Sequence, residues 1–257
     1  MSKKFLNFDG ERIDLTIANI KNFSHHFERY RFAFNNIDFK VDVLDGACGS
    51  GYGAYALSLH DNCKSITGID ISSDAITQAK SLFNSKKLNY FVDNLVSTNF
   101  KDQSFDLITS FETIEHLKNI QDAFKEFKRI IKPNGKIILS VPDIDTNKNA
   151  GYENKYHFNE LSLKDFKKIL NSNFTNCEFY FQEANHPKII QKFISFLGSS
   201  LPIYIKNWLK KSSPRHIKID QDYINLNLHS INSNIKNLSQ LNYDKTKRYF
   251  WIAVCKV

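Results

Sequence analysis

Short apolar runs alternate with amphipathic stretches from residue 41 onward. The runs are rich in branched and aromatic residues and have the length of strands, whereas the stretches between them have helical spacing. Ser72 or Ser73 can cap one helix, and Asn119 can cap another. The alternation predicts βαβ units in an α/β fold with a doubly wound, mostly parallel sheet. The five expected strands are residues 41–45, 65–70, 88–92, 105–110 and 135–141.

Two more strand-like runs, 176–182 and 248–257, are separated by a long segment of different character. That segment begins with a broken apolar stretch and then becomes polar and rich in Asn. We expect it to be a helical cap that binds the acceptor or contacts another copy, with a membrane-surface element less favoured. The expected domains are an N-terminal helical cover at 1–40, a core at 41–184 and 247–257, and an inserted cap at 185–246.

The chain is basic, with 35 Lys and Arg against 27 Asp and Glu and a net charge of +8. This charge suits an anionic partner, but the basic residues are scattered, so we expect no nucleic-acid arm. Four cysteines, Cys48, Cys63, Cys177 and Cys255, lie far apart and predict neither a zinc site nor a disulfide framework. Without a signal-peptide pattern or a membrane-spanning window, the expected location is the cytoplasm, with no stable membrane insertion.

The strongest motif is Asp45-Gly46-Ala47-Cys48-Gly49-Ser50-Gly51-Tyr52-Gly53, between the first strand and an apolar helix. Its glycines let the backbone turn sharply and approach a ligand closely, as a nucleoside or amino-acid cradle requires. Asp70 ends the second strand, where a carboxylate can accept both hydroxyl hydrogens of a ribose. The pattern Gly49-x-Gly51-x-x-Ala54 also satisfies the dinucleotide fingerprint, so these residues alone leave NAD open.

Further separated features accompany this loop, namely Asp93 after the third strand and Phe105-Asp106 opening the fourth. With these features the chain resembles the class I S-adenosylmethionine-dependent methyltransferases over residues 25–171 and the final strand. The resemblance implies a Rossmann-like sheet of seven strands with an antiparallel last strand and the cap between the last two. Ala47 is a mild departure, because the commonest family pattern has glycine there.

The resemblance also implies where S-adenosylmethionine binds. Asp45 and the glycine loop would hold its methionine part, Asp70 its ribose, and Ile71 and the Asp93 segment its adenine. Arg29 is a candidate partner for the cofactor carboxylate, although a solvated surface arginine fits the sequence equally well. The expected cofactor-binding residues are Arg29, Asp45, Gly46, Ala47, Gly49, Gly51, Asp70, Ile71, Asp93, Asn94, Leu95 and Phe111.

The stretch 110–117, after the fourth strand, lies where cofactor and acceptor should meet. His116 is the expected general base, because its ordinary pKa near ~6.5 suits proton removal at neutral pH; a helix-capping histidine is the alternative. Glu115 and His157 complete the expected catalytic set, and Glu112, Tyr156 and His157 are expected to bind substrate. No metal is expected, since no ligand spacing is present.

The whole pattern resembles methyltransferases that accompany capsule or O-antigen polysaccharide synthesis. It implies O-methylation of a sugar hydroxyl on a nucleotide-linked, phosphorylated or polysaccharide acceptor, and the positive charge suits an anionic one. Another small molecule, such as a quinone or lipid, is the alternative acceptor. From a different class, an NAD-dependent oxidoreductase and a non-catalytic binding module remain open, as does a homodimer.

Overall fold

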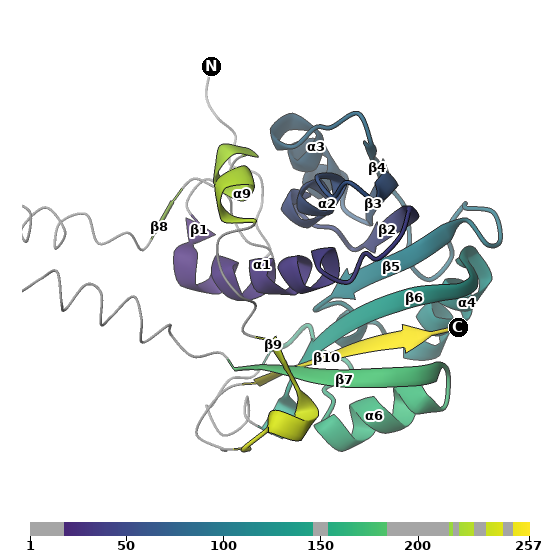
Figure 1. Cartoon of the computed structure of the whole chain (residues 1–257). Helices are drawn as coiled ribbons and strands as arrows, with labels where there is room; N and C mark the ends of the chain where they lie inside the picture. The colour runs from purple at the N-terminus through teal and green to yellow at the C-terminus, as the bar shows by residue number, and fades with distance from the viewer. Residues whose placement is uncertain (1–17, 146–153, 184–215, 218–220, 229–234, 244–248) are drawn as a thin grey trace, which may run out of the picture.

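The computed structural model describes residues 18–145, 154–183, 216–217, 221–228, 235–243 and 249–257 (Figure 1). Its central sheet has the strand order β4-β3-β2-β5-β6-β10-β7-β9. The strands are β2 (Val41–Gly46), β3 (Cys63–Asp70), β4 (Leu88–Val92), β5 (Phe105–Phe111), β6 (Ile131–Pro142), β7 (Thr175–Glu183), β9 (Ile235–Asn237) and β10 (Tyr249–Lys256). The predicted α/β fold with a mostly parallel sheet is confirmed.

Strands β2 to β6 pair in parallel, and β10 lies antiparallel between β6 and β7. The expected antiparallel last strand is therefore present. The predicted strand number, seven, is wrong, because the described residues form an eight-stranded sheet. The additional strand, β9, comes from the segment expected to be a helical cap and pairs antiparallel with β7. Its three residues are too few to show a period in the sequence.

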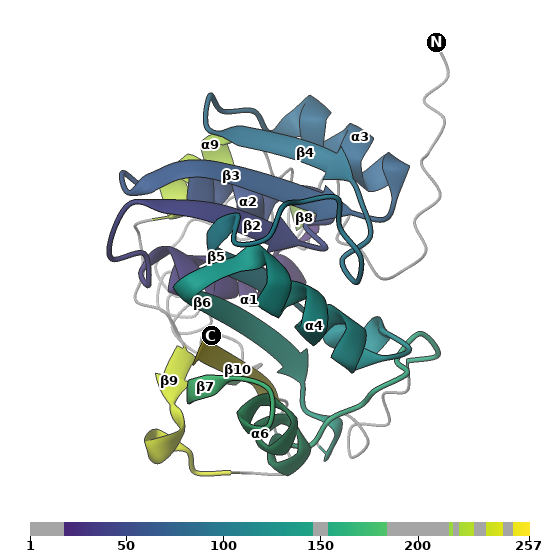
Figure 2. The same ribbon diagram turned by 90° about the vertical axis from the view of Figure 1, so that its right-hand side faces the viewer.

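Two hydrophobic cores cover the two faces of the sheet, as neighbouring residues of β2 show: Val43 packs in one core and Leu44 in the other. The first core holds α1 (Ile20–Phe34), α2 (Tyr52–Ser58), α3 (Ser73–Leu82) and α9 (Gln221–Asn227). The second holds α4 (Ile120–Ile130) and α6 (Leu163–Asn171). Figure 2 shows α4 and α6 together on one side of the sheet. Outside the sheet, β1 (Ala18–Asn19) pairs with β8 (His216–Ile217).

Local signals explain where the helices begin. Ser72, rather than Ser73, caps α3 by accepting a hydrogen bond from the Ala75 amide at 3.3 Å. Asn119 caps α4 in the same way, accepting from the Gln121 amide at 3.1 Å. Each cap satisfies a backbone donor that the first helical turn leaves without a partner.

Much of the expected cap, including 184–215, 218–220 and 229–234, lies outside the described residues. Its described parts pack on the core, because Ile224, Leu228 and Ile235 join the first hydrophobic core. The domain boundaries stay a prediction. No helix among the described residues is long and apolar enough to cross a membrane.

A disulfide joins Cys177 on β7 to Cys255 on β10. The expectation that the cysteines form no disulfide is wrong for this pair. The two residues are 78 positions apart in the chain, and only the antiparallel pairing of β7 with β10 brings them together. Cys48 and Cys63 are free thiols, and both are buried.

Candidate functional site

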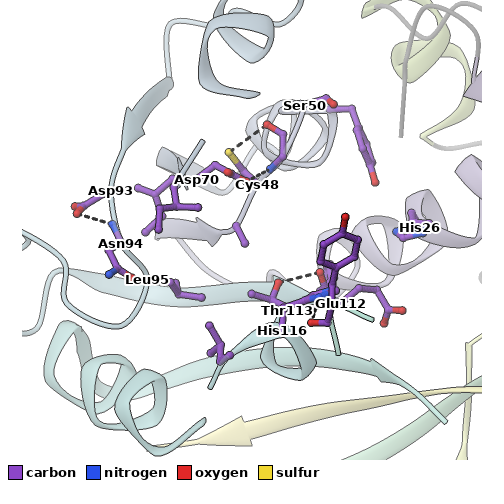
Figure 3. Close-up of a pocket in the computed structure, with 18 of the residues that line it drawn as sticks. His26, Cys48, Ser50, Asp70, Asp93, Asn94, Leu95, Glu112, Thr113 and His116 are labelled. Atoms are coloured by element: carbon purple, nitrogen blue, oxygen red, sulfur yellow. Dashed lines mark hydrogen bonds between the residues drawn. The ribbon is translucent and has the colours of Figure 1, made fainter. Parts of the chain in front are cut away.

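A cavity of about 480 Å³ opens at the carboxyl ends of β2, β3, β4 and β5. This is the edge of a doubly wound sheet where ligands bind. Figure 3 shows Asp70, Asp93 and Asn94 in one part of it and Glu112, Thr113 and His116 in another. The lining comprises His26, Tyr30, Ala47, Cys48, Gly49, Ser50, Tyr52, Ile69, Asp70, Ile71, Asp93, Asn94, Leu95, Phe111, Glu112, Thr113, His116, Leu117, Tyr156 and Phe158.

The glycine loop forms one wall of the cavity through a run of left-handed residues. Ala47, Gly49 and Gly51 have φ values of 59°, 53° and 84°. The positive φ of Ala47 explains why glycine is common at this position in the family that the sequence resembles. Gly51 must also lack a side chain, since a Cβ there would lie 2.7 Å from the Tyr90 hydroxyl oxygen. Ala47 and Gly49 line the cavity, whereas Gly46 and Gly51 do not.

Asp70 holds the glycine loop and the start of α3 together. Its carboxylate accepts hydrogen bonds from the Gly49 amide at 3.0 Å and the Ser72 amide at 2.9 Å. Although it is 8% exposed, Asp70 lines the cavity. The next residue, Ile71, is 74% exposed and offers an apolar surface at the same place.

Asp93, Asn94 and Leu95 follow β4 and also line the cavity. The Asp93 carboxylate accepts from the Asn94 amide at 2.8 Å and from the Asn99 amide at 3.2 Å. These bonds are typical of an aspartate that organises a turn after a strand. The residue therefore organises its own loop and faces the cavity at the same time.

Asp45 is fully buried and is absent from the cavity lining. It accepts hydrogen bonds from the Thr109 hydroxyl at 2.8 Å and the Tyr30 hydroxyl at 3.2 Å. Burial raises the pKa of the Asp45 carboxyl to about 7. The structure thus places Asp45 behind Tyr30, and direct contact between Asp45 and a cofactor stays a prediction.

Arg29 is fully buried on α1, so the alternative of a solvated surface arginine is wrong. Its guanidinium donates to Gln182 Oε1 at 3.3 Å and stacks 4.4 Å above the Phe250 ring. Nη2 lies 3.6 Å from Glu112 Oε2, which makes an ion pair with a residue of the cavity wall. Arg29 itself does not line the cavity, and its predicted contact with a cofactor carboxylate is not tested.

Glu112 directly follows β5 and reaches the cavity from a left-handed conformation, with φ of 51°. Its carboxylate accepts from the Ser140 hydroxyl at 2.9 Å, and its amide donates to the Ser140 carbonyl at 3.1 Å. These bonds and the Arg29 ion pair hold the carboxylate between β5, β6 and α1.

The predicted catalytic residues come together although two loops supply them. Ligand atoms of Glu115, His116 and His157 all lie within 4.8 Å of one another. The two imidazole rings meet edge to face, with centroids 4.8 Å apart. His116 and Tyr156 line the cavity, Glu115 is 1% exposed, and the His157 ring lies beside His116.

Several lining residues were not predicted from the sequence. Tyr30, Tyr52 and His26 belong to helices whose aromatic spacing indicates only a buried face. Phe158, which is 60% exposed, follows the predicted Tyr156 and His157 directly. Burial holds the pKa of His26 well below its ordinary value, so this imidazole is neutral at pH 7.

Comparison with known proteins agrees with this arrangement. A family model described as a methyltransferase domain matches residues 44–139. Residues 44–139 form a methyltransferase domain. The match spans the glycine loop, Asp70, Asp93 and the Glu112–His116 turn, and it confirms a methyltransferase domain in this part of the chain.

Two curated relatives and one solved structure describe the similarity further. A protein of Mycolicibacterium smegmatis, named as a probable S-adenosylmethionine-dependent methyltransferase, is 25% identical over 64% of this chain and 63% of its own length. A ubiquinone biosynthesis O-methyltransferase of Coxiella burnetii is 35% identical over 38% of this chain and 42% of its own. The YcgJ protein of Bacillus subtilis shares the fold, with a TM-score of 0.56, 17% identity, and coverage of 90% of this chain and 98% of its own. The chain thus matches less than two thirds of either curated relative.

Proposed function

We propose that this chain is a methyltransferase that binds S-adenosylmethionine in the cavity and methylates an oxygen of a small acceptor. One observation carries the proposal: a single cavity joins the glycine loop and Asp70 to Glu112 and His116. S-adenosylmethionine is the cofactor in the name of the Mycolicibacterium relative, and it is the cofactor of this domain.

The residues of the cavity fit this cofactor. No atom lies within 4 Å of a Cβ built on Gly49, so the space above the glycine loop is open. Asp70 presents a carboxylate for the ribose hydroxyls, and Ile71 and Leu95 provide apolar surface for the adenine. The cavity of about 480 Å³ falls within the usual range of ~300–1,000 Å³ for ligand sites.

The bound cofactor supplies a methyl group already activated by a sulfonium, so the protein has to align the acceptor and remove its proton. Tyr156 and Phe158 provide aromatic surface for the acceptor beside His116. Removal of the proton belongs to the group of Glu115, His116 and His157, which the 154–160 loop and the turn after β5 bring together.

A sugar hydroxyl, on a nucleotide-linked, phosphorylated or polysaccharide acceptor, is the proposed site of methylation. The support is the resemblance of the sequence to methyltransferases of surface-polysaccharide synthesis, together with the net charge of +8, which suits an anionic acceptor. A quinone is the second candidate, because the Coxiella relative is named for ubiquinone biosynthesis. We propose further that 185–246 caps the acceptor side of the core.

Calorimetric titration with S-adenosylhomocysteine, with NAD in a parallel cell, tests the cofactor. We expect micromolar binding of S-adenosylhomocysteine alone, and binding of NAD alone would contradict the proposal. Incubation with labelled S-adenosylmethionine and either nucleotide sugars or quinols then separates the acceptor classes. Label transfer to quinols but to no sugar would reject the sugar acceptor, and cofactor binding without any transfer would favour a binding module.

A further inference from the structure

Three side chains with metal-binding chemistry converge at the acceptor end of the cavity. Glu115 and His116 belong to the short 3-10 helix η1 (Ile114–His116), and His157 comes from the loop after β6. One carboxylate oxygen and two imidazole nitrogens lie within 4.8 Å of one another. Three atoms this close always have a common point within about 2.8 Å of each, so shifts of less than about 1 Å would bring all three to metal–ligand distances of ~2.0–2.2 Å.

Backbone hydrogen bonds fix the two loops to each other at this point. The amides of Phe158 and Asn159 both donate to the Glu115 carbonyl, at 2.8 and 3.0 Å. The Asn159 side chain also donates to the Leu117 carbonyl. His157 is therefore held beside Glu115 and His116 by its immediate neighbours in the chain, and the group is organised before any ligand arrives.

In each of the two histidines, Nδ1 lies near an oxygen atom outside the cluster. His116 Nδ1 lies 3.2 Å from the Tyr156 carbonyl oxygen. The tautomer that donates to this carbonyl carries its proton on Nδ1 and presents the Nε2 lone pair. His157 Nδ1 lies 3.8 Å from Glu160 Oε1, which is longer than a hydrogen bond but places a carboxylate beside the ring. Metal-binding histidines usually have such a carbonyl or carboxylate behind them, because it fixes the ring and raises its basicity.

We propose that Glu115, His116 and His157 bind one divalent transition-metal cation, with remaining coordination positions open to the cavity. Two imidazoles and one carboxylate suit Mn²⁺, Co²⁺ or Zn²⁺ better than Mg²⁺ or Ca²⁺, which prefer oxygen ligands. His116 lines the cavity, whereas Glu115 and His157 do not, so the proposed cation would lie at the cavity wall and reach the acceptor beside His116. This proposal departs from the sequence-based expectation of no metal.

The role of this cation rests on the proposed function. In the metal-bound protein His116 and His157 act as ligands, and the cation lowers the pKa of an acceptor hydroxyl so that its proton passes to water. The hydroxyl oxygen forms the new bond to the methyl carbon while the carbon–sulfur bond breaks and its electron pair stays on sulfur. The need for a free imidazole as base then disappears.

Cobalt titration of the untagged, chelator-treated full chain tests the site directly. Visible absorption follows Co²⁺ binding, and calorimetry repeats the titration with Mn²⁺, Zn²⁺ and Mg²⁺. We expect one Co²⁺ per chain with micromolar affinity, and affinity for Mg²⁺ at least about 10-fold weaker than for Mn²⁺. Parallel titration with S-adenosylhomocysteine in metal-free buffer reports whether each variant retains its cofactor site.

Three variants separate a metal site from a structural cluster. His157→Gln should lose the Co²⁺ spectrum, and Glu160→Gln should weaken Co²⁺ binding about 10-fold by removing the partner of the imidazole. His60→Gln is the control, because this histidine hydrogen-bonds the Asn62 amide far from the cluster and should bind Co²⁺ like the wild type.

Absence of saturable binding by the wild type, or an unchanged spectrum in His157→Gln, would overturn the metal site. S-adenosylhomocysteine binding would persist in that case and leave the proposed function standing. Metal binding without S-adenosylhomocysteine binding would instead reject the function while keeping the site.

Discussion

Asp45 is an acidic residue in the interior, and its environment makes stability depend on pH. Burial raises its carboxyl pKa from 3.8 to about 7, in spite of hydrogen bonds from Thr109 and Tyr30. Between these two values the unfolded chain has released a proton that the folded chain keeps. The contribution to stability is therefore fully present below pH 3.8 and is lost as pH rises through about 7.

Asp45→Asn should remove this part of the pH dependence. We expect the free energy of unfolding of the wild type to fall more steeply between pH 5 and pH 8 than that of the variant. Urea unfolding at pH 5 and pH 8 gives, for each protein, the change in the free energy of unfolding between these pH values. Because only these changes are compared, a general loss of stability in the variant does not affect the result. Equal pH dependence in the two proteins would show that Asp45 is already ionised at pH 5.

Asp70→Asn tests the ribose position of the cavity. Hydrogen bonds to a charged group contribute ~1.5–3 kcal/mol each, so losing the charge should weaken S-adenosylhomocysteine binding about 10- to 100-fold. Calorimetry measures the affinity. Asp74→Asn is the matched control, because Asp74 lies exposed in the first turn of α3. Equal affinity of the two variants would remove Asp70 from the cofactor site.

At the scale of elements, helix α1 closes the cavity because Gly53 lets it approach α2. A Cβ at Gly53 would lie 2.0 Å from the Tyr30 ring, whose hydroxyl binds Asp45. Tyr30 also meets Phe111 edge to face at 4.9 Å, so one ring connects α1 to β5 and the glycine loop. A methyl group added at position 53 would therefore push apart two elements of the cavity wall, α1 and α2.

Gly53→Ala should push α1 away from α2. Overpacking of this kind costs about 1–3 kcal/mol, and S-adenosylhomocysteine binding should weaken as Tyr30 moves. Gly49→Ala is the comparison, because nothing lies within 4 Å of its Cβ and only its positive φ of 53° makes it costly. Urea unfolding should give a loss of about 1 kcal/mol for Gly49→Ala. A larger loss for Gly49→Ala than for Gly53→Ala would contradict the proposed packing.

At the scale of the whole molecule, the last strand is fixed twice. β10 pairs with β6 on one side and β7 on the other, and the Cys177–Cys255 disulfide adds a covalent link to β7. The link closes a loop of 78 residues that contains the entire 185–246 segment. Cross-linking a loop of this length restricts the unfolded chain and thereby stabilises the folded one.

Reduction of the disulfide should lower stability by about 2–4 kcal/mol. Thermal unfolding with and without dithiothreitol measures the effect. The melting temperature of the wild type should be lower with dithiothreitol than without it. Cys177→Ser should melt at the reduced temperature in both buffers. A wild type insensitive to reductant would mean that the bridge contributes nothing to stability.

The sequence by itself determined the features that local order encodes. Periodicity placed the parallel strands, and Ser72 and Asn119 marked the starts of two helices. The motifs around Asp45, Gly49, Asp70 and Asp93 carried the resemblance to methyltransferases, because strand-turn-helix units hold their ligand contacts in short segments.

Only the tertiary structure decided what depends on contacts between distant segments. The burial of Arg29 against Gln182, the Cys177–Cys255 bridge and the convergence of His157 on His116 join residues 153, 78 and about 40 positions apart. The short edge strand β9 likewise exists because β7 offers it a partner. No local period reports such pairings, since they arise when the sheet brings its strand ends and loops to one edge.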